Sequence, residues 1–326
     1  MERARIDPAP RNAWRNGLGT LLLASALFGV MAVLVRAASR HVPATQVAFV
    51  RFVGSFLFML AATRGRGLEP RPGNVRRLIF RGIIGAASIT FYFLGIAGAG
   101  AGLATLVQNS YPVFATLLAA VLGDVIFTRQ LGAALLLSVL GALVVLGGRI
   151  DVASASTFGI LASIAASMLA GGAVVTAQHL RRSEGAAIIT TWFMGVGMVV
   201  TSPALLAGMP PLDAGTVALL GGVILTSVLA QWLLHHGLGF TSATQGSLAA
   251  ATSVFLATAL EAITLGTVPA PRTFVGAALM LGAVALAWRG PRPTLVASVN
   301  LPAVPPRPAT PADALRRAAA RARAAR

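Results

Sequence analysis

The feature that most constrains this chain is a series of apolar stretches, each long enough to cross a membrane as a helix. Cutting the sequence at its charged residues and its Pro and Gly breaks leaves ten of them. They cover about residues 17–36, 44–62, 78–98, 102–122, 131–148, 156–178, 186–208, 215–237, 244–266 and 273–289. About 20 apolar residues in a helix span the roughly 30 Å hydrocarbon core of a bilayer. The sequence therefore predicts an all-α integral membrane protein with ten transmembrane helices.

The composition argues against the soluble classes of protein. Only 11% of the 326 residues are charged and 56% are hydrophobic, whereas soluble domains carry about 25% charged residues. With nine acids, four histidines and no cysteine, the chain has few groups for a clustered catalytic or metal site. We therefore expect no enzyme activity, no metal and no cofactor. The 26 basic residues lie between apolar stretches rather than on one folded face, so we also expect no nucleic-acid partner.

The distribution of arginine predicts the orientation in the membrane. Cytoplasmic loops carry an excess of basic residues, and every basic residue here is an arginine. If the N-terminus is cytoplasmic, most of them, including Arg76, Arg77 and Arg81, fall on cytoplasmic segments, while Arg51 is left within a span. We therefore expect a multi-pass protein of a bacterial-type inner membrane, with both termini in the cytoplasm.

Short runs recur in the same order in the two halves of the chain. Gly132-Ala-Ala-Leu135 recurs as Gly276-Ala-Ala-Leu279, and Pro112-Val-Phe114 corresponds to Ser253-Val-Phe255, with offsets between 140 and 144 residues. Each half holds five predicted spans, and because five is odd, the second copy enters the membrane upside down. The sequence thus predicts a 5+5 inverted repeat, an arrangement common in transporters.

This repeat divides the chain into four parts. We expect a basic cytoplasmic N-terminus at 1–16, a first five-helix repeat at 17–150, an inverted second repeat at 151–290, and a tail at 291–326. The tail starts as a Pro-rich linker and ends in an Ala/Arg-rich stretch. That stretch is either a basic helix on anionic lipid of the inner leaflet or a solvated tail, and both remain open. Because the duplication lies within one chain, we expect the protein to function as a monomer.

Three groups of motifs resemble those of a known family. They are Pro43 with Arg51; Pro112-Val-Phe with Gly123-Asp124 and Gly132; and Ser253-Val-Phe with Gly266-Thr267 and Gly276. On these motifs, residues 17–289 resemble the drug/metabolite transporter superfamily, specifically its paired EamA-domain members with ten helices. The chain departs from the family pattern where Asp124 replaces a glutamate, Thr267 replaces the second acid and Ser253 replaces the second proline. A role for paired loop acids is therefore not carried over.

The resemblance implies a secondary transporter of small organic solutes, often an exporter of amino-acid-like, metabolite or drug-like compounds, working by alternating access. Proton coupling fits this class. Three alternatives share the fold and stay open: a facilitative uptake permease, a channel, and a flippase of a lipid-linked substrate. A flippase would need a lateral opening and basic groups for a pyrophosphate, whereas an exporter needs a central pocket.

Charged residues within the spans indicate where such a pocket would lie, because hydrocarbon makes them costly unless they find water or a partner. Arg51 and Glu261 lie roughly 10 Å and 8 Å from the outer ends of their helices, at about 1.5 Å per residue. We hypothesise that they pair or face one cavity. Glu261 would be the proton-coupling or cation-binding group, and Arg51 would hold a substrate carboxylate. The alternative for Arg51 is a helix-packing role with bonds to backbone carbonyls.

Uncharged polar and aromatic residues supply the remaining candidates for substrate contacts. They are Tyr92, Gln108, Asn109, Ser110, Tyr111, Trp232, Gln245 and Ser253. Pro112 removes a backbone donor from the fourth span and is expected to kink it. The alternative for the polar residues is that they join packed helices through hydrogen bonds.

Two further pairs are weaker candidates. His235 and His236 titrate near neutral pH in their ordinary state but point to different faces of one helix, so we expect no shared metal site. Asp124 and Arg129 flank a tight loop, and we expect them to interact with each other.

Overall fold

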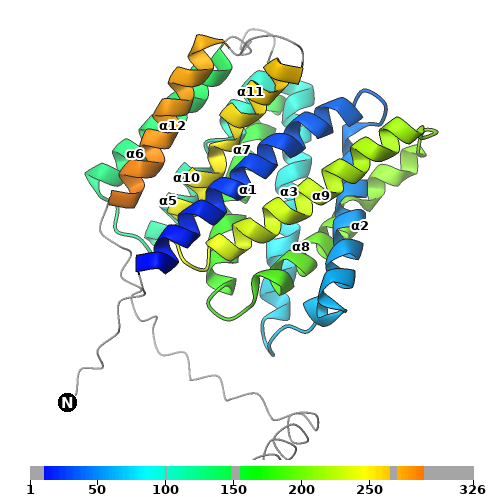
Figure 1. The fold of residues 1–326 in the computed structure, drawn as a ribbon, viewed down its shortest axis with the longest axis horizontal. Helices are drawn as coiled ribbons and strands as arrows, with labels where there is room; N and C mark the ends of the chain where they lie inside the picture. The colour runs from blue at the N-terminus through cyan, green and yellow to red at the C-terminus, as the bar shows by residue number, and fades with distance from the viewer. Residues whose placement is uncertain (1–10, 100, 148–154, 265–269, 290–326) are drawn as a thin grey trace, which may run out of the picture. The chain divides into compact units, whose positions relative to one another are not determined.

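A computed structural model describes residues 11–99, 101–147, 155–264 and 270–289, and within these residues the chain forms only helices and their connections (Figure 1). The elements are α1 Arg11–Ala38, α2 Ala44–Thr63, η1 Arg66–Leu68, α3 Val75–Ala99, α4 Ala101–Gln108, α5 Tyr111–Val121, α6 Arg129–Leu146, α7 Thr157–Leu180, α8 Ala186–Thr201, η3 Ser202–Ala207, α9 Ala214–Gly237, α10 Ala243–Ala251, α11 Ser253–Thr264 and α12 Pro271–Arg289. The predicted tail at 291–326 and the first ten residues lie outside the described part.

The helices form ten spans within the described residues, each long and apolar enough to cross a membrane. Seven spans are single helices, and the seventh span extends α8 into η3. The fourth combines α4 with α5, and the ninth combines α10 with α11. The expectation of an all-helical, ten-span membrane protein is therefore confirmed. Below, the N-side is the membrane face at which α1 begins, and successive spans alternate between the N-side and the opposite side.

Polar residues begin several helices where the backbone N–H groups lack a partner within the helix. Ser156 accepts a hydrogen bond from the Gly159 N–H at the start of α7, and Asp213 accepts one from the Thr216 N–H at the start of α9. At α10, Ser242 is the N-cap of a full capping box in which the amide oxygen of Gln245 accepts from the Ser242 N–H. These caps place the starts of the spans at defined residues.

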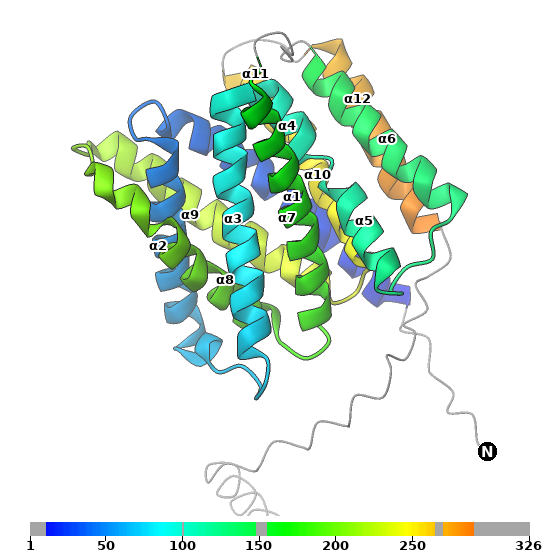
Figure 2. The same cartoon turned by 180° about the vertical axis from the view of Figure 1, so that it is seen from behind.

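The two halves of the chain are interleaved. The most extensive helix pairs each join one half to the other: α3 packs on α7, α6 on α12, and α1 on α9. Figures 1 and 2 show α6 and α12 side by side from both directions. The largest cluster of buried apolar residues also draws on both halves and includes Leu21, Ala115, Val175, Leu248 and Trp288.

Close helix contacts repeat at one constant offset. A Cβ on Gly171 of α7 would lie 2.7 Å from the Ala115 backbone nitrogen and 2.9 Å from the Phe114 Cβ. A Cβ on Gly29 of α1 would lie 2.9 Å from the Leu256 Cβ. Gly29 and Gly171 are 142 residues apart, and so are Phe114 and Leu256. The same helix crossing is thus built twice, which is the 5+5 duplication that the recurrent runs predicted.

Candidate functional site

The fourth span is interrupted between α4 and α5. Pro112 has no backbone N–H, and its ring prevents a helical bond to the carbonyl of Gln108. That carbonyl accepts a hydrogen bond from the hydroxyl of Ser167 on α7, at 3.3 Å. The break that Pro112 creates is therefore stabilised by a helix from the other half of the chain.

The ninth span is interrupted between α10 and α11, although it has no proline. The Thr252 hydroxyl donates to the Ala249 carbonyl at 2.6 Å. Its oxygen also lies 2.7 Å from the Ser25 hydroxyl oxygen of α1, in a hydrogen bond between the two side chains. Ser25 and Ser167 are 142 residues apart, so they occupy equivalent positions in the two repeats, and each forms a hydrogen bond at one of the two breaks. Discontinuous helices at matching positions of two repeats are typical of substrate sites in transporters.

The predicted polar residues of the first break have different surroundings. The Asn109 amide donates back to the Thr105 carbonyl at 2.9 Å, and the Ser110 hydroxyl donates to the Leu106 carbonyl at 3.2 Å. Both therefore bond within their own helix. Gln108 differs, because its buried Oε1 has no hydrogen-bond partner among the described residues. Of these three side chains, Gln108 is the one with a buried polar atom that lacks a partner among the described residues.

Both predicted tyrosines join neighbouring elements. The Tyr92 hydroxyl of α3 shares a 2.7 Å hydrogen bond with the Thr105 hydroxyl of α4. The Tyr111 hydroxyl of α5 donates to the Ser247 carbonyl of α10 at 2.9 Å. Tyr111 therefore links the two interrupted spans directly.

The remaining uncharged candidates lie apart from this link. Besides its capping role, Gln245 donates its amide to the Ala287 carbonyl of α12 at 3.3 Å. Ser253 is the first residue of α11 and is partly exposed. Trp232 is 37% exposed, and its ring stacks on His236 with the centroids 5.7 Å apart. These contacts do not test whether the three residues bind substrate, so each predicted role stays a prediction.

Arg51 is buried within α2 and reaches the second half of the chain. Its Nε donates to the Ser227 hydroxyl of α9 at 2.6 Å, and its guanidinium carbon lies 5.1 Å from the Phe52 ring centroid. Neither contact is with a backbone carbonyl. Glu261 lies on α11, but its side chain is outside the described part of the structure. The pairing of Arg51 with Glu261 therefore stays a prediction.

Arg81 is a functional candidate that the sequence analysis missed. We counted it with the arginines of a cytoplasmic segment, but Arg81 lies on α3 and is only 4% exposed, so it is a buried charge. Its Nη2 donates to Nε2 of His235 on α9 at 3.3 Å, and its guanidinium carbon lies 4.4 Å from the Phe193 ring centroid. Arg81 is close to the start of α3, so its charge was taken for one at the membrane boundary. Its partners lie on helices more than 100 residues away in the sequence.

The hydrogen bonds around His235 define its protonation. An arginine can only donate, so His235 Nε2 must accept from Arg81 and carries no proton. Nδ1 then holds the proton and donates to the Thr190 hydroxyl oxygen at 2.8 Å, while that hydroxyl donates to the Ala186 carbonyl. Gln231 Nε2 lies 3.2 Å from His235 Nε2 as a second donor. His235 is thus a neutral imidazole that uses both nitrogens, and the prediction that His236 faces elsewhere is confirmed by its stacking on Trp232.

One face of α9 carries a stripe of buried polar side chains. Ser227, Gln231 and His235 follow one another at intervals of four residues, with exposures of 0%, 5% and 0%. Residues four apart lie on the same face of a helix. Arg51 contacts one end of the stripe and Arg81 the other, about 12 Å apart along the helix at about 1.5 Å per residue. We call Ser227, Gln231 and His235 the α9 polar stripe.

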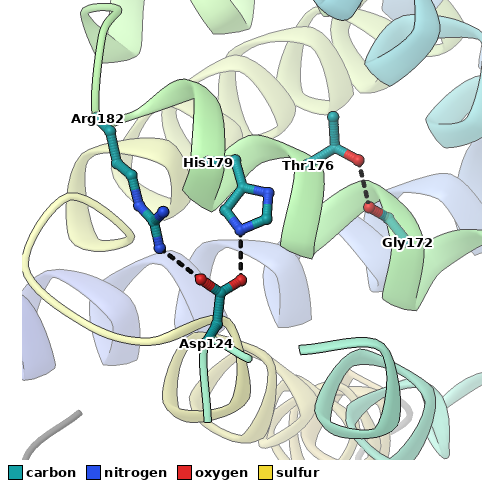
Figure 3. Close-up of polar contacts among 5 residues, drawn as sticks. All are labelled: Asp124, Gly172, Thr176, His179 and Arg182. Atoms are coloured by element: carbon teal, nitrogen blue, oxygen red, sulfur yellow. Dashed lines mark hydrogen bonds and ion pairs between the residues drawn. The ribbon is translucent and has the colours of Figure 1, made fainter. Parts of the chain in front are cut away.

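An acidic residue joins two loops at the N-side (Figure 3). Asp124, which follows α5, accepts from Arg182 Nη2 at 2.7 Å with one oxygen and hydrogen-bonds His179 Nε2 with the other. Within the described residues its ion pairs are with these two side chains. The expected Asp124 and Arg129 interaction is wrong. The chain after α7 turns back toward Asp124, so Arg182 is closer to it than the neighbour in sequence.

The Asp124 contacts predict a pH-dependent stability. Partial burial acts to raise the pKa of the Asp124 carboxyl, but the hydrogen bonds and charges of Arg182 and His179 outweigh it and hold the pKa below its usual value. Such a carboxylate stabilises the folded state above its unfolded pKa of about 3.9, and the contribution disappears as pH falls through the lowered pKa. We expect Asp124→Asn to lower the free energy of unfolding in detergent by about 0.5–1 kcal/mol at pH 7. The difference should shrink as the pH falls below about 3.9 and vanish once the pH is below the lowered pKa of the folded protein.

Arginine variants provide the control for this prediction. Arg182→Gln should reproduce most of the Asp124→Asn effect at pH 7, and Arg129→Gln should leave stability unchanged. An equal loss in Arg129→Gln and Arg182→Gln would contradict the contact.

An inverted repeat of ten spans, with a discontinuous helix at the matching position of each half, defines this molecule as a membrane protein with a transporter architecture. The sequence profile of the EamA-like transporter family matches residues 15–147 and again residues 157–289. The chain belongs to this family.

Relatives agree with this assignment. The chain is 28% identical over 227 residues to the pseudopaline exporter CntI from two strains of Pseudomonas aeruginosa, covering 67% of this chain and 79% of the relative. A solved crystal structure superimposes with a TM-score of 0.71 at 20% identity, covering 86% of this chain and 97% of the other. The structural likeness concerns the fold alone.

Proposed function

We propose that this EamA-like transporter is a secondary active exporter that moves small organic solutes out of the cytoplasm by alternating access. The observation that carries the proposal is the matched pair of helix breaks, each held by the repeat-related serine, Ser25 or Ser167, of the opposite half. Breaks of this kind free backbone groups for a substrate at mid-membrane depth. The similarity to the pseudopaline exporters favours outward transport of small metabolites.

The proposed orientation places the N-side in the cytoplasm of a bacterial-type inner membrane. The exposed arginines that follow α2 and those in the first turn of α3 support it, because basic residues gather on the cytoplasmic side. They are Arg64, Arg66, Arg71, Arg76 and Arg77. We further propose that the basic termini contact anionic lipid of the inner leaflet and that one chain suffices for transport.

Within this proposal the candidate residues have separate roles. Arg51 holds a carboxylate of an amino-acid-like or drug-like solute, since its terminal nitrogens form no hydrogen bond with any described residue. Gln108 contacts the solute through its unpartnered Oε1 at the first break. Glu261 takes up the coupling proton or cation, because an acid within a span is costly unless it has a function.

Metabolite profiling of cells and medium tests the function. We expect one or a few small organic solutes to accumulate in the medium when the intact chain is overexpressed, compared with an empty vector. Accumulation inside the cells would instead indicate an uptake permease. A change confined to lipid-linked material would indicate a flippase, and no change in any of these pools would refute solute transport.

The role of Glu261 has a separate test. Uptake of the identified solute into inside-out vesicles by the intact chain should rise when the vesicle interior is more acidic than the surrounding buffer. Glu261→Gln should abolish this dependence on the pH gradient. Glu69→Gln is the matched control, because Glu69 is an exposed acid in a loop. A Glu261→Gln protein with the same pH profile as the intact chain would overturn the coupling role.

A further inference from the structure

The guanidinium of Arg81 is buried with two of its nitrogens unused. Nε and Nη1 are inaccessible and have no hydrogen-bond partner among the described residues, while Nη2 contacts only the neutral His235. Within the described residues no carboxylate forms an ion pair with Arg81. A buried charge without a counter-ion costs several kcal/mol in a protein. Such a residue within a membrane span is therefore a candidate for a functional ion site.

The surroundings keep this guanidinium in place. A Cβ on Gly85, one helical turn further along α3, would lie 2.3 Å from Arg81 Nη1 and 2.8 Å from a ring carbon of Phe193. The missing side chain at Gly85 therefore leaves the space that the guanidinium occupies. The Phe193 ring covers its face, and His235 fixes one of its edges.

The location of Arg81 relates it to the transport route. It lies on α3 of the first half, and its contacts lie on α8 and α9 of the second half. His235 is near the N-side end of α9, whereas Ser227, the contact of Arg51, is about 12 Å further into the membrane at about 1.5 Å per residue. The α9 polar stripe thus has a cationic group at each end.

We infer that Arg81 is a second anion-binding group on the transport route, which takes a carboxylate of the solute at the N-side before Arg51 takes it deeper in the membrane. The inference rests on the proposed function and narrows its substrate class to solutes that carry a carboxylate. When the helices around Arg81 separate at the N-side, Nε and Nη1 become available to the carboxylate. Between the two arginines, Gln231 and Ser227 offer hydrogen-bonding groups along the stripe. One carboxylate balances the single charge of Arg81, whereas a phosphate would bring an excess of negative charge.

Export by four strains tests this inference: the intact chain, Arg81→Gln, Arg81→Lys and Arg77→Gln. Arg77 is the matched control, because it lies one turn before Arg81 on α3 and is exposed. We expect Arg81→Gln to reduce export of carboxylate-bearing solutes about tenfold or more, as the loss of a hydrogen bond to a charged group implies. Arg81→Lys should keep part of the export and Arg77→Gln all of it. Unchanged export by Arg81→Gln, or exported solutes without a carboxylate, would overturn the inference.

Binding by purified protein separates a failure of this inference from a failure of the proposed function. Thermal unfolding in detergent is measured with formate, with the neutral formamide and with inorganic phosphate. We expect formate alone to raise the unfolding temperature of the intact chain, and to lose this effect in Arg81→Gln and in Gly85→Ala, which displaces the guanidinium. An equal response to formate and formamide overturns the anion site, and a larger response to phosphate overturns the carboxylate assignment. If formate binds through Arg81 but no strain moves any solute, the proposed function fails and the site stands.

Folding of Arg81→Gln is checked by its amount in the membrane and by size-exclusion chromatography. Removing a buried charge that lacks a counter-ion is not expected to unfold the protein. If Arg81→Gln is nevertheless absent from the membrane, the comparison of Arg81→Lys with Gly85→Ala in the formate measurement decides, since both keep the charge and only Gly85→Ala moves it.

Discussion

Replacing Gly171 by alanine is expected to destabilise the folded protein, whereas the same change at the adjacent Gly172 is expected to stabilise it. A Cβ at Gly171 would lie 2.7 Å from a backbone nitrogen of α5, and backbone cannot move aside as a side-chain end can. Overpacking of this kind costs about 1–3 kcal/mol. A Cβ at Gly172 meets its nearest neighbour at 3.8 Å, which is ordinary contact. There the gain in helix propensity, about 0.5–1 kcal/mol, remains.

Reversible unfolding in mixed micelles with increasing denaturing detergent measures this pair of changes. Gly29→Ala is the internal replicate, because the repeat places Gly29 in the same crossing against Leu256. It should lose stability as Gly171→Ala does. Effects of the same sign and size at Gly171 and Gly172 would contradict the close approach of α7 to α5.

Replacing Arg51 by glutamine is expected to weaken the apparent affinity for a carboxylate-bearing solute about 10- to 150-fold, the range that corresponds to about 1.5–3 kcal/mol for a hydrogen bond to a charged group. The reason is that, among the described residues, Arg51 donates a hydrogen bond only through its Nε, to the Ser227 hydroxyl. Initial rates of solute transport in vesicles, measured over a range of concentrations, give KM and the maximal rate separately. KM should rise while the amount of folded protein stays the same.

Two variants separate binding from packing at this position. Ser227→Ala removes the hydroxyl that orients Arg51 but keeps the charge, so its effect on KM should be smaller. Arg51→Lys keeps the charge without the guanidinium and should lie between the two. A fall in folded protein with an unchanged KM for Arg51→Gln would show that Arg51 serves helix packing instead.

The architecture was predictable from the sequence because its signals are local or periodic. Spans of about 20 apolar residues and the recurrence of Gly132-Ala-Ala-Leu135 at Gly276 indicated ten helices in two copies, and the helices and the glycine crossings have that arrangement. Pro112 marked the place where the fourth span is interrupted. The interruption at Thr252 has no proline that predicts it, and the only signal was its place in the repeat, beside the Ser253 that aligns with Pro112.

The side-chain contacts were less predictable because their partners are distant in sequence. The depth of Arg51 within its span was evident, but not that it would meet Ser227 rather than a backbone carbonyl. Arg81 was assigned to the boundary because a charge near the end of a span resembles a topology signal. Its burial depends on His235 and Phe193, which no local pattern connects to it. The Asp124 contact was assigned to a sequence neighbour for the same reason.

The interleaving of the two halves has a consequence for how the chain is made. When the first five spans have left the ribosome, α1 still lacks α9, α3 lacks α7 and α6 lacks α12, which are their main packing partners. The first five helices are therefore inserted into the bilayer without these partners, and they can pack fully only after the second half has been synthesised. A chain cut after the fifth span would lack these packing partners, so we do not expect it to form a working half-transporter.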